Sequence, residues 1–382
     1  MKPVVVQHLT EDDTHKKAIN DYWELTEEDK FNFKIIDITN KYDLQPPQIS
    51  ELIDIKAIAY SSKYACEVCK KPYIFRNRSH FSKTGKSFKW TCEECHESAN
   101  SYQINQKCRI LEKNFTDAMD TSGKIDVTDR SLIELLYLIS VIRYSGTNLK
   151  TEITPYESID GLSLSPSSEI DSLIYKTLID KKIIAINPIK NIERVQYIDS
   201  ENIDYDWQKV SWVITVHGYA TVLEKTIEKI ENKLINKQWS GIQFDEAKNI
   251  TEFLLINEAI NFAYKLSGKN NFYISQDHYL SIFEFSRKLI RTQTISQICM
   301  LIYQAGMFAN NFFLEKKRDA ELAGSVFIKT LDTKAKNVIN EQREVKPLNL
   351  SSKHNSTINK LWFNEILCFE GQEFNMIADD LL

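Results

Sequence analysis

The chain has 382 residues, which is more than one ordinary hydrophobic core supports, so we expect two or more domains. Hydrophobic residues make up 42% of it and charged residues 26%, proportions that are typical of a folded soluble protein and not of a disordered one. The net charge of −5 argues against a protein that coats DNA through bulk electrostatics. Any nucleic-acid contact must therefore come from a local basic patch.

The sequence shows neither a secretory signal nor a membrane span. The apolar run Val4–Val6 is too short for a signal core, and the longer apolar stretches are interrupted by Lys, Glu or Asn. Seven cysteines, four of them in two close pairs, fit a metal site in a reducing compartment better than a disulfide framework. We therefore expect a cytoplasmic protein with no membrane partner.

Residues 1–60 are interpreted as a region of helix-turn-helix type. Thr26 can cap a first helix, whose apolar residues recur at helical spacing: Phe31, Ile35, Ile38 and Tyr42. Pro46 and Pro47 suit the first turn of a second helix over residues 48–55. Gln48 in that helix is of a type that contacts base edges in DNA. A purely structural pair of helices is the alternative.

Residues 61–115 contain two Cys-x-x-Cys pairs, Cys66 with Cys69 and Cys92 with Cys95. Four thiolates complete the tetrahedral shell of Zn²⁺ and leave no position open for water, so we expect a structural zinc site. Residues 73–76 and 88–90 read as two strands around a turn at 82–85, a pattern typical of a zinc ribbon. The rival interpretation, two redox dithiols, would need a surrounding βαβ pattern, which is absent.

The segment between the two cysteine pairs is strongly basic. From residue 70 to residue 91 it contains no acid and seven cations: Lys70, Lys71, Arg76, Arg78, Lys83, Lys86 and Lys89. Aromatic residues are interleaved with them: Tyr73, Phe75, Phe81, Phe88 and Trp90. Because cations neutralise phosphates and exposed aromatic rings stack on bases, this pattern predicts a nucleic-acid contact, with DNA favoured over RNA. In the alternative, the aromatic residues form a small core and the lysines face water.

Residues 66–96 also resemble the zinc-stapled form of the HNH nuclease family, in which the second cysteine pair is followed by His. The resemblance implies a catalytic His, for which His80 is the candidate, and a second metal-binding His, for which His96 is the candidate. No Asn lies between His80 and Cys92 to fix the loop geometry, so metal-assisted hydrolysis is poorly supported. We expect a protein without catalytic activity and keep a metal-dependent nuclease as one alternative.

A cluster of Asp, Thr, Ser and Gly at 116–128 indicates a domain boundary. Residues 129–200 then predict a helix over 129–146, a second helix after Ser165-Pro166 and a strand over 183–186, an order that resembles a winged-helix unit. The second helix opens with Glu169 and Asp171, and these acids favour packing or protein contact over DNA contact.

Residues 205–348 predict a mainly helical domain. A strand is expected over 210–216, and helices are expected over 221–236, 245–266, 276–292, 296–317 and 319–340. Asp277 and His278, near a turn, would be the first candidates if this domain held a catalytic pocket. Residues 349–382 form an acidic and apolar tail, which we expect to fold back over 361–369 and to be mobile or bound to a partner over 370–382.

The sequence as a whole predicts a multidomain α+β protein that is mostly α-helical. Its expected function is that of a zinc-stabilised nucleic-acid-binding or regulatory protein, which contacts DNA through the zinc ribbon. Besides the metal-dependent nuclease, the alternative to this function is a protein-interaction scaffold in which zinc is purely structural. Its protein partner would bind at the helical domain or at the C-terminal tail.

Overall fold

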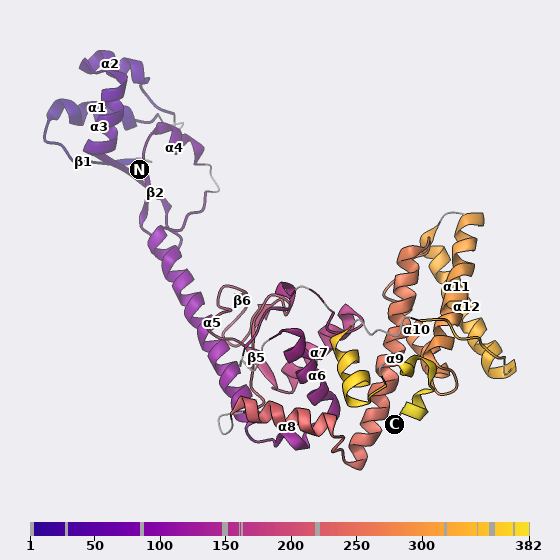
Figure 1. The fold of residues 1–382 in the computed structure, drawn as a ribbon. Helices are drawn as coiled ribbons and strands as arrows, with labels where there is room; N and C mark the ends of the chain where they lie inside the picture. Colours follow the sequence, from indigo (N-terminus) through magenta and orange to yellow (C-terminus); the bar gives the residue numbers. More distant parts are fainter. Residues whose placement is uncertain are drawn as a thin grey trace. The chain divides into compact units, whose positions relative to one another are not determined.

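The protein is mostly helical, with small antiparallel sheets, and its chain divides into two compact units, Met1–Asn105 and Gln106–Leu382 (Figure 1). The structure is a computed structural model that describes residues 4–26, 30–84, 88–146, 152–159, 161, 163–217, 222–316, 319–341, 343–350, 356–369 and 371–381. In these ranges no helix combines the length and the apolar character that a membrane crossing requires.

The first unit combines a three-stranded antiparallel sheet with short helices. The sheet has the order β1-β2-β3, with β1 (Val5–His8), β2 (Ala57–Ala65) and β3 (Pro72–Phe75). The helices are α1 (Asp13–Trp23), α2 (Ile35–Tyr42), α3 (Pro46–Lys56) and α4 (Arg78–Lys83). Helix α5 (Glu93–Ser122) begins in this unit and continues into the second.

The core of the first unit contains residues that lie far apart in the sequence. Its fully or almost fully buried side chains include Ile19 and Trp23 from α1, Ile38 from α2, Ile49 from α3 and Phe75 from β3. Helix α1 is capped by Asp12, whose carboxylate accepts the backbone N–H groups of Thr14 and His15. The helices α1, α2 and α3 cover the sheet, and their apolar side chains form one continuous cluster with those of the sheet.

The two expected N-terminal helices are both present, but the first begins later than its apolar spacing indicates. Helix α2 starts at Ile35, where the carboxylate of Asp37 accepts the N–H of Lys34 at 3.1 Å. Ahead of it, Leu25 and Phe31 form an isolated antiparallel bridge, so the expected start at Thr26 is wrong. Strand β1 and helix α1 were not expected, because their few apolar positions are surrounded by charged residues.

The second unit opens with a small α/β arrangement. Its helices are α6 (Leu132–Tyr144), α7 (Ser168–Asp180) and α8 (Leu223–Ile235), with short 3₁₀ turns η1 (Val127–Asp129) and η2 (Tyr156–Ser158). One antiparallel sheet has the order β4-β8-β5, with β4 (Glu152–Ile153), β8 (Trp212–Ile214) and β5 (Ile184–Ile186). A separate hairpin joins β6 (Val195–Tyr197) to β7 (Ile203–Tyr205). The strands β4, β6 and β7 were not expected, because each has only two or three residues and, unlike β5 and β8, none lies in a longer apolar run.

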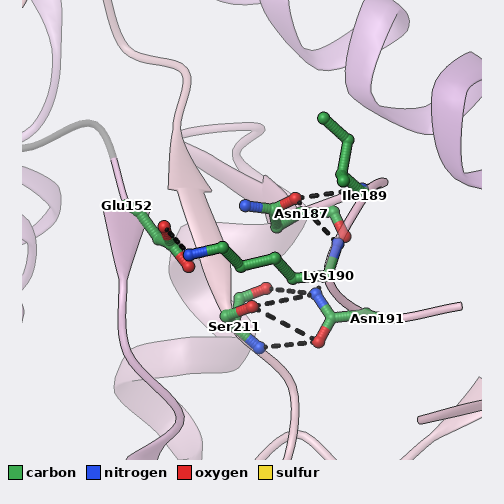
Figure 2. Close-up of polar contacts among 6 residues, drawn as sticks. All are labelled: Glu152, Asn187, Ile189, Lys190, Asn191 and Ser211. Atoms are coloured by element: carbon green, nitrogen blue, oxygen red, sulfur yellow. Dashed lines mark hydrogen bonds and ion pairs between the residues drawn. The ribbon is translucent and has the colours of Figure 1, made fainter. Parts of the chain in front are cut away.

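A buried amide holds the loop after β5 against the start of β8 (Figure 2). Asn191 is fully buried, and its side-chain NH₂ donates to the backbone carbonyls of Asn187 at 2.9 Å and Ser211 at 2.8 Å. Its side-chain oxygen accepts the N–H of Ser211 at 2.9 Å. Beside it, Lys190 pairs with Glu152 of β4 at 2.6 Å. The buried polar groups of this loop therefore satisfy one another.

The rest of the second unit is a helical assembly. It consists of α9 (Gly241–Lys269), α10 (His278–Leu289), α11 (Ile295–Lys316), α12 (Ala320–Glu341), α13 (Thr357–Asn359), a π-helical turn η3 (Lys360–Ile366), η4 (Gln372–Asn375) and η5 (Ala378–Leu381). The expected helices at 245–266, 276–292, 296–317 and 319–340 correspond to α9 through α12. At the start of α10, the ring nitrogen Nδ1 of His278 accepts the N–H of Ser275 at 3.3 Å.

The C-terminal tail packs within this unit. Trp362 is fully buried, donates from its indole N–H to the hydroxyl of Thr251 at 3.0 Å and stacks on Trp239 with ring centres 5.9 Å apart. The expected fold-back of residues 361–369 is therefore confirmed. The expected mobile end is wrong for the described residues beyond them, since Phe374 and Leu381 are buried as well. The apolar side chains of the tail are used inside its own unit.

Candidate metal centre

The four paired cysteines come from two different kinds of local structure. Cys66 and Cys69 lie in the turn that joins β2 to β3, and Cys92 and Cys95 lie at the start of α5. The β2–β3 turn closes because Lys70 adopts a left-handed backbone conformation with φ of 62°. Its N–H donates to the carbonyl of Cys66 at 3.0 Å. A tight turn and a helix start thereby present two sulfurs each.

The sulfur atoms of the four cysteines have the spacing of a metal site. All four lie within 4.8 Å of one another, and the sulfurs of Cys69 and Cys92 are 3.5 Å apart. Tetrahedral coordination with Zn–S bonds of about 2.3 Å places sulfurs about 3.8 Å apart. Within the described ranges, this is the one group of three or more metal-ligating side chains that is compact enough to share an ion. The quartet expected from the sequence can therefore hold a metal ion.

Backbone hydrogen bonds tie the two halves of the centre together. The N–H of Cys92 donates to the sulfur of Cys66 at 3.3 Å, and the N–H of Glu67 donates to the carbonyl of Trp90 at 3.0 Å. The N–H of Cys66 donates to the carbonyl of Lys71 at 2.8 Å, which closes the base of the turn. These hydrogen bonds position the sulfurs in addition to any ion that they bind.

The thiols of the centre influence one another's protonation. Burial by itself raises the pKa of the Cys66 thiol, but backbone N–H groups, with that of Cys92 the largest contributor, lower this pKa to about 6. The pKa of Cys95 is raised to about 12, chiefly through hydrogen bonds with the sulfurs of Cys69 and Cys92. The thiolate of Cys66 thus forms more readily than that of Cys95, and a bound cation would favour deprotonation of all four thiols.

The structure differs from the expected hairpin between the two cysteine pairs. The strand expected over 73–76 is present as β3 (Pro72–Phe75), but its partner strand is β2, which precedes the first cysteine pair. Residues 78–83 form helix α4, and residues 88–90 have no regular secondary structure. The alternation of aromatic residues that indicated a second strand has another origin: these side chains pack on one another around a single strand.

The aromatic residues form a cluster of edge-to-face contacts. The ring of Tyr73 lies 5.1 Å from that of Phe88 and 4.8 Å from that of Trp90, and Phe75 lies 5.1 Å from Phe81. Such pairs stabilise a small core beyond the area that they bury. Phe88 keeps 37% of its surface exposed, whereas Phe75 and Phe81 are buried. The rings of Phe75 and Phe81 are therefore unavailable for stacking on bases, whereas those of Tyr73, Phe88 and Trp90 are partly exposed.

The expected nucleic-acid residues fall into several groups. Lys70, Lys71, Arg76, Lys83 and Lys89 are exposed, whereas Lys86 lies outside the described residues. Among the exposed ones, Lys71 pairs with Glu94 at 2.9 Å and Lys89 lies 3.9 Å from Glu67. Gln48 is exposed as well, but its side-chain oxygen accepts the N–H of Gln45 at the start of α3. The paired acids Glu67 and Glu94 lie beside the cysteines in the sequence, just outside the segment 70–91 that contains no acid.

Arg78 has a structural position that its charge alone does not indicate. Its guanidinium donates to the backbone carbonyls of Tyr22 at 2.6 Å, Phe33 at 2.6 Å and Asp21 at 3.3 Å. It also lies over the rings of Tyr22 and Phe31, 4.4 and 4.5 Å from their centres. Arg78 therefore joins α4 to the segments around α1 and α2, and its donors are turned inward, away from any external phosphate.

We expect Arg78→Met to destabilise the first unit by about 2–4 kcal/mol, because it leaves three partly buried carbonyls without donors. Arg78→Lys should recover little of this loss, since a single ammonium cannot span three carbonyls. Thermal unfolding of the metal-loaded protein, followed by circular dichroism, would measure the effect. Arg76→Met is the matched control and should change the free energy of unfolding by less than about 0.5 kcal/mol. Equal effects of Arg76→Met and Arg78→Met would contradict the assigned role.

The two histidines suggested by the nuclease resemblance make local contacts. Nε2 of His80 lies 2.7 Å from the hydroxyl of Tyr73, and Nδ1 of His96 lies 3.2 Å from the side-chain amide of Asn100. Neither belongs to the group of side chains that is close enough to share an ion.

Comparison of the chain with protein-family models, with curated proteins and with solved structures gave no match.

Proposed function

We propose that the four cysteines bind one structural Zn²⁺ ion. Four sulfur donors at tetrahedral spacing suit zinc, and a complete protein shell leaves no position for substrate or water. The ion would connect the β2–β3 turn to the start of α5 and so complete the first unit. This role needs no catalytic residue near the metal.

We further propose that the first unit binds nucleic acid through the exposed cations around this centre. The observation that supports the proposal is the exposure of Lys70, Lys83 and Lys89, all within the acid-free segment 70–91 of an otherwise acidic protein. Within the described residues, Lys83 forms no ion pair, and the contact of Lys89 with Glu67 is long and exposed. Contact would therefore be mainly to phosphates, since the rings of Phe75 and Phe81 are buried and those of Tyr73, Phe88 and Trp90 pack on one another.

The triple substitution of Lys70, Lys83 and Lys89 by Ala tests this function. If each lysine neutralises one phosphate, the slope of log K against log[salt] should fall in magnitude by about 2 to 3 for duplex DNA. Fluorescence anisotropy with a labelled 20-base-pair duplex and a labelled single strand, each from 50 to 200 mM salt, would measure it. Substitution of Lys248, Lys265 and Lys269 on α9 by Ala is the control. An unchanged slope in the first variant would exclude the proposed surface.

A second candidate function, a protein-interaction scaffold, is supported by the second unit. We propose that α6 to β8 form a winged-helix-type unit, because α6, β4, α7, β5 and β8 follow in that order and the three strands form one sheet with β8 at its centre, while the β6–β7 hairpin lies between β5 and β8 in the sequence. The β6–β7 hairpin would be its wing and α7 its second helix. The hairpin carries the acids Asp199, Glu201 and Asp204. Their negative charges would repel a phosphate backbone, so this unit is better suited to protein partners than to nucleic acid.

A further inference from the structure

A cavity of about 660 Å³ lies beside β3, within the first unit. Its lining includes residues 71–74 and Arg76 together with Glu93, Glu94 and Glu97 from the first turns of α5. His80, Trp90 and Cys92 complete the lining. Residues of one strand and acidic residues of one helix therefore share this cavity.

Strand β3 is at the edge of its sheet. It pairs with β2 on one side, and the described residues include no strand on its other side. In an antiparallel pair, successive residues alternate between those bonded to the neighbouring strand and those that direct their N–H and C=O groups away from it. The free edge of β3 therefore offers backbone groups to an added strand. Ile74, which is 50% exposed, adds an apolar side chain at this edge.

The charged residues of the cavity lining determine which kind of strand would fit. Glu94 is paired with Lys71, whereas Glu93 and Glu97 form no ion pair within the described residues. These two lie four residues apart and thus on the same face of α5. The lining contains three carboxylates against the two cations Lys71 and Arg76, and this excess of negative charge repels a phosphate backbone and attracts Lys or Arg side chains. Charge complementarity therefore favours a basic peptide over nucleic acid at this position.

We propose that this cavity binds an extended peptide segment with basic side chains, which adds to the free edge of β3. The backbone of the peptide would hydrogen-bond to β3, its apolar side chains would contact Ile74 and Trp90, and a Lys or Arg side chain would reach Glu93 and Glu97. This site uses other residues than the lysines assigned above to nucleic acid, so the two activities can be tested separately.

The test uses the full-length, zinc-loaded protein and fluorescein-labelled octapeptides, with anisotropy as the readout. A peptide of alternating Val and Lys should bind, and one of alternating Val and Glu should not. The double variant Glu93→Gln with Glu97→Gln should bind the basic peptide about tenfold more weakly. The pair Glu51→Gln and Asp54→Asn on α3 is the matched control and should change the affinity less than twofold, and zinc content should be equal in all variants.

Two further measurements distinguish strand addition from loose charge attraction. N-methylation of every second residue of the basic peptide removes the N–H donors from one of its two edges. Two such peptides can be made, and the one that is methylated on the edge facing β3 should not bind. Hydrogen exchange should slow at residues 72–76 when the peptide is bound. The proposal is overturned if the wild-type protein does not bind the basic peptide, if both N-methylated peptides bind normally, or if a single-stranded DNA 12-mer occupies the cavity. DNA in the cavity would bind the double Gln variant more tightly than the wild-type protein, which is the opposite of the change expected for the basic peptide.

Discussion

Cys66→Ser is expected to remove the bound metal and unfold the first unit while the second unit stays folded. Cys66 is fully buried, and its sulfur contributes to a group whose four members come from the β2–β3 turn and from the start of α5. Metal binding at such a site contributes free energy on the order of 10 kcal/mol, which exceeds the whole stability of most small domains. The second unit contains its own large apolar core, to which the cysteine quartet does not belong.

Metal content and limited proteolysis would measure this effect together. The wild-type chain should contain one zinc per molecule by elemental analysis, and Cys66→Ser should contain none. Protease should then cut within residues 4–84 of the variant and leave a resistant fragment that includes α6 to α12. Cys368→Ser, at an exposed cysteine outside the quartet, should behave as wild type. A zinc-free wild-type protein with an intact first unit would refute the metal assignment.

Removal of the ion by a chelator should give the same result without any substitution. Zinc thiolate bonds require deprotonated cysteines, so retention of the metal must weaken as the pH falls and protons compete for the sulfurs. The first unit should therefore lose zinc on acidification and regain it on return to neutral pH.

Gly324→Ala is expected to destabilise the second unit by about 3 kcal/mol or more. A Cβ at this position in α12 would lie 1.9 Å from the backbone oxygen of Tyr273, far inside van der Waals contact. The obstacle is backbone, and it is held in place because the N–H of Tyr273 donates to the carbonyl of Ala320 at 2.9 Å. Neither element can yield without loss of that bond, so overpacking at this contact is unusually costly.

Gly268→Ala is the matched control for this glycine. Gly268 lies in α9, and a Cβ there meets no atom within 4 Å. Because Ala is favoured over Gly in a helix, this variant should be as stable as wild type or more stable by about 0.5–1 kcal/mol. Chemical denaturation of both variants gives the comparison. Equal stability of Gly324→Ala and Gly268→Ala would show that α12 does not pack against Tyr273 as described.

Part of the fold follows from local sequence patterns. The helices α9 to α12 and the helix α6 carry long runs of apolar residues at helical spacing, and that periodicity is sufficient to find them. Helix α1 was missed because its buried residues are few and lie among charged ones. The start of α2 was misplaced because Phe31 continues the helical spacing but lies in a bridge with Leu25.

The cysteine quartet, which can hold a metal ion, is what the sequence by itself determined, because two thiols separated by two residues converge wherever the backbone makes a tight turn or begins a helix. Only the tertiary structure decided what the segment between the cysteines does. It paired β3 with β2, packed the aromatic rings on one another, turned Arg78 inward to three carbonyls and placed Glu93 and Glu97 in the lining of the same cavity as residues of β3. These outcomes depend on contacts between residues far apart in the chain, and neither composition nor spacing records which partners a side chain will meet.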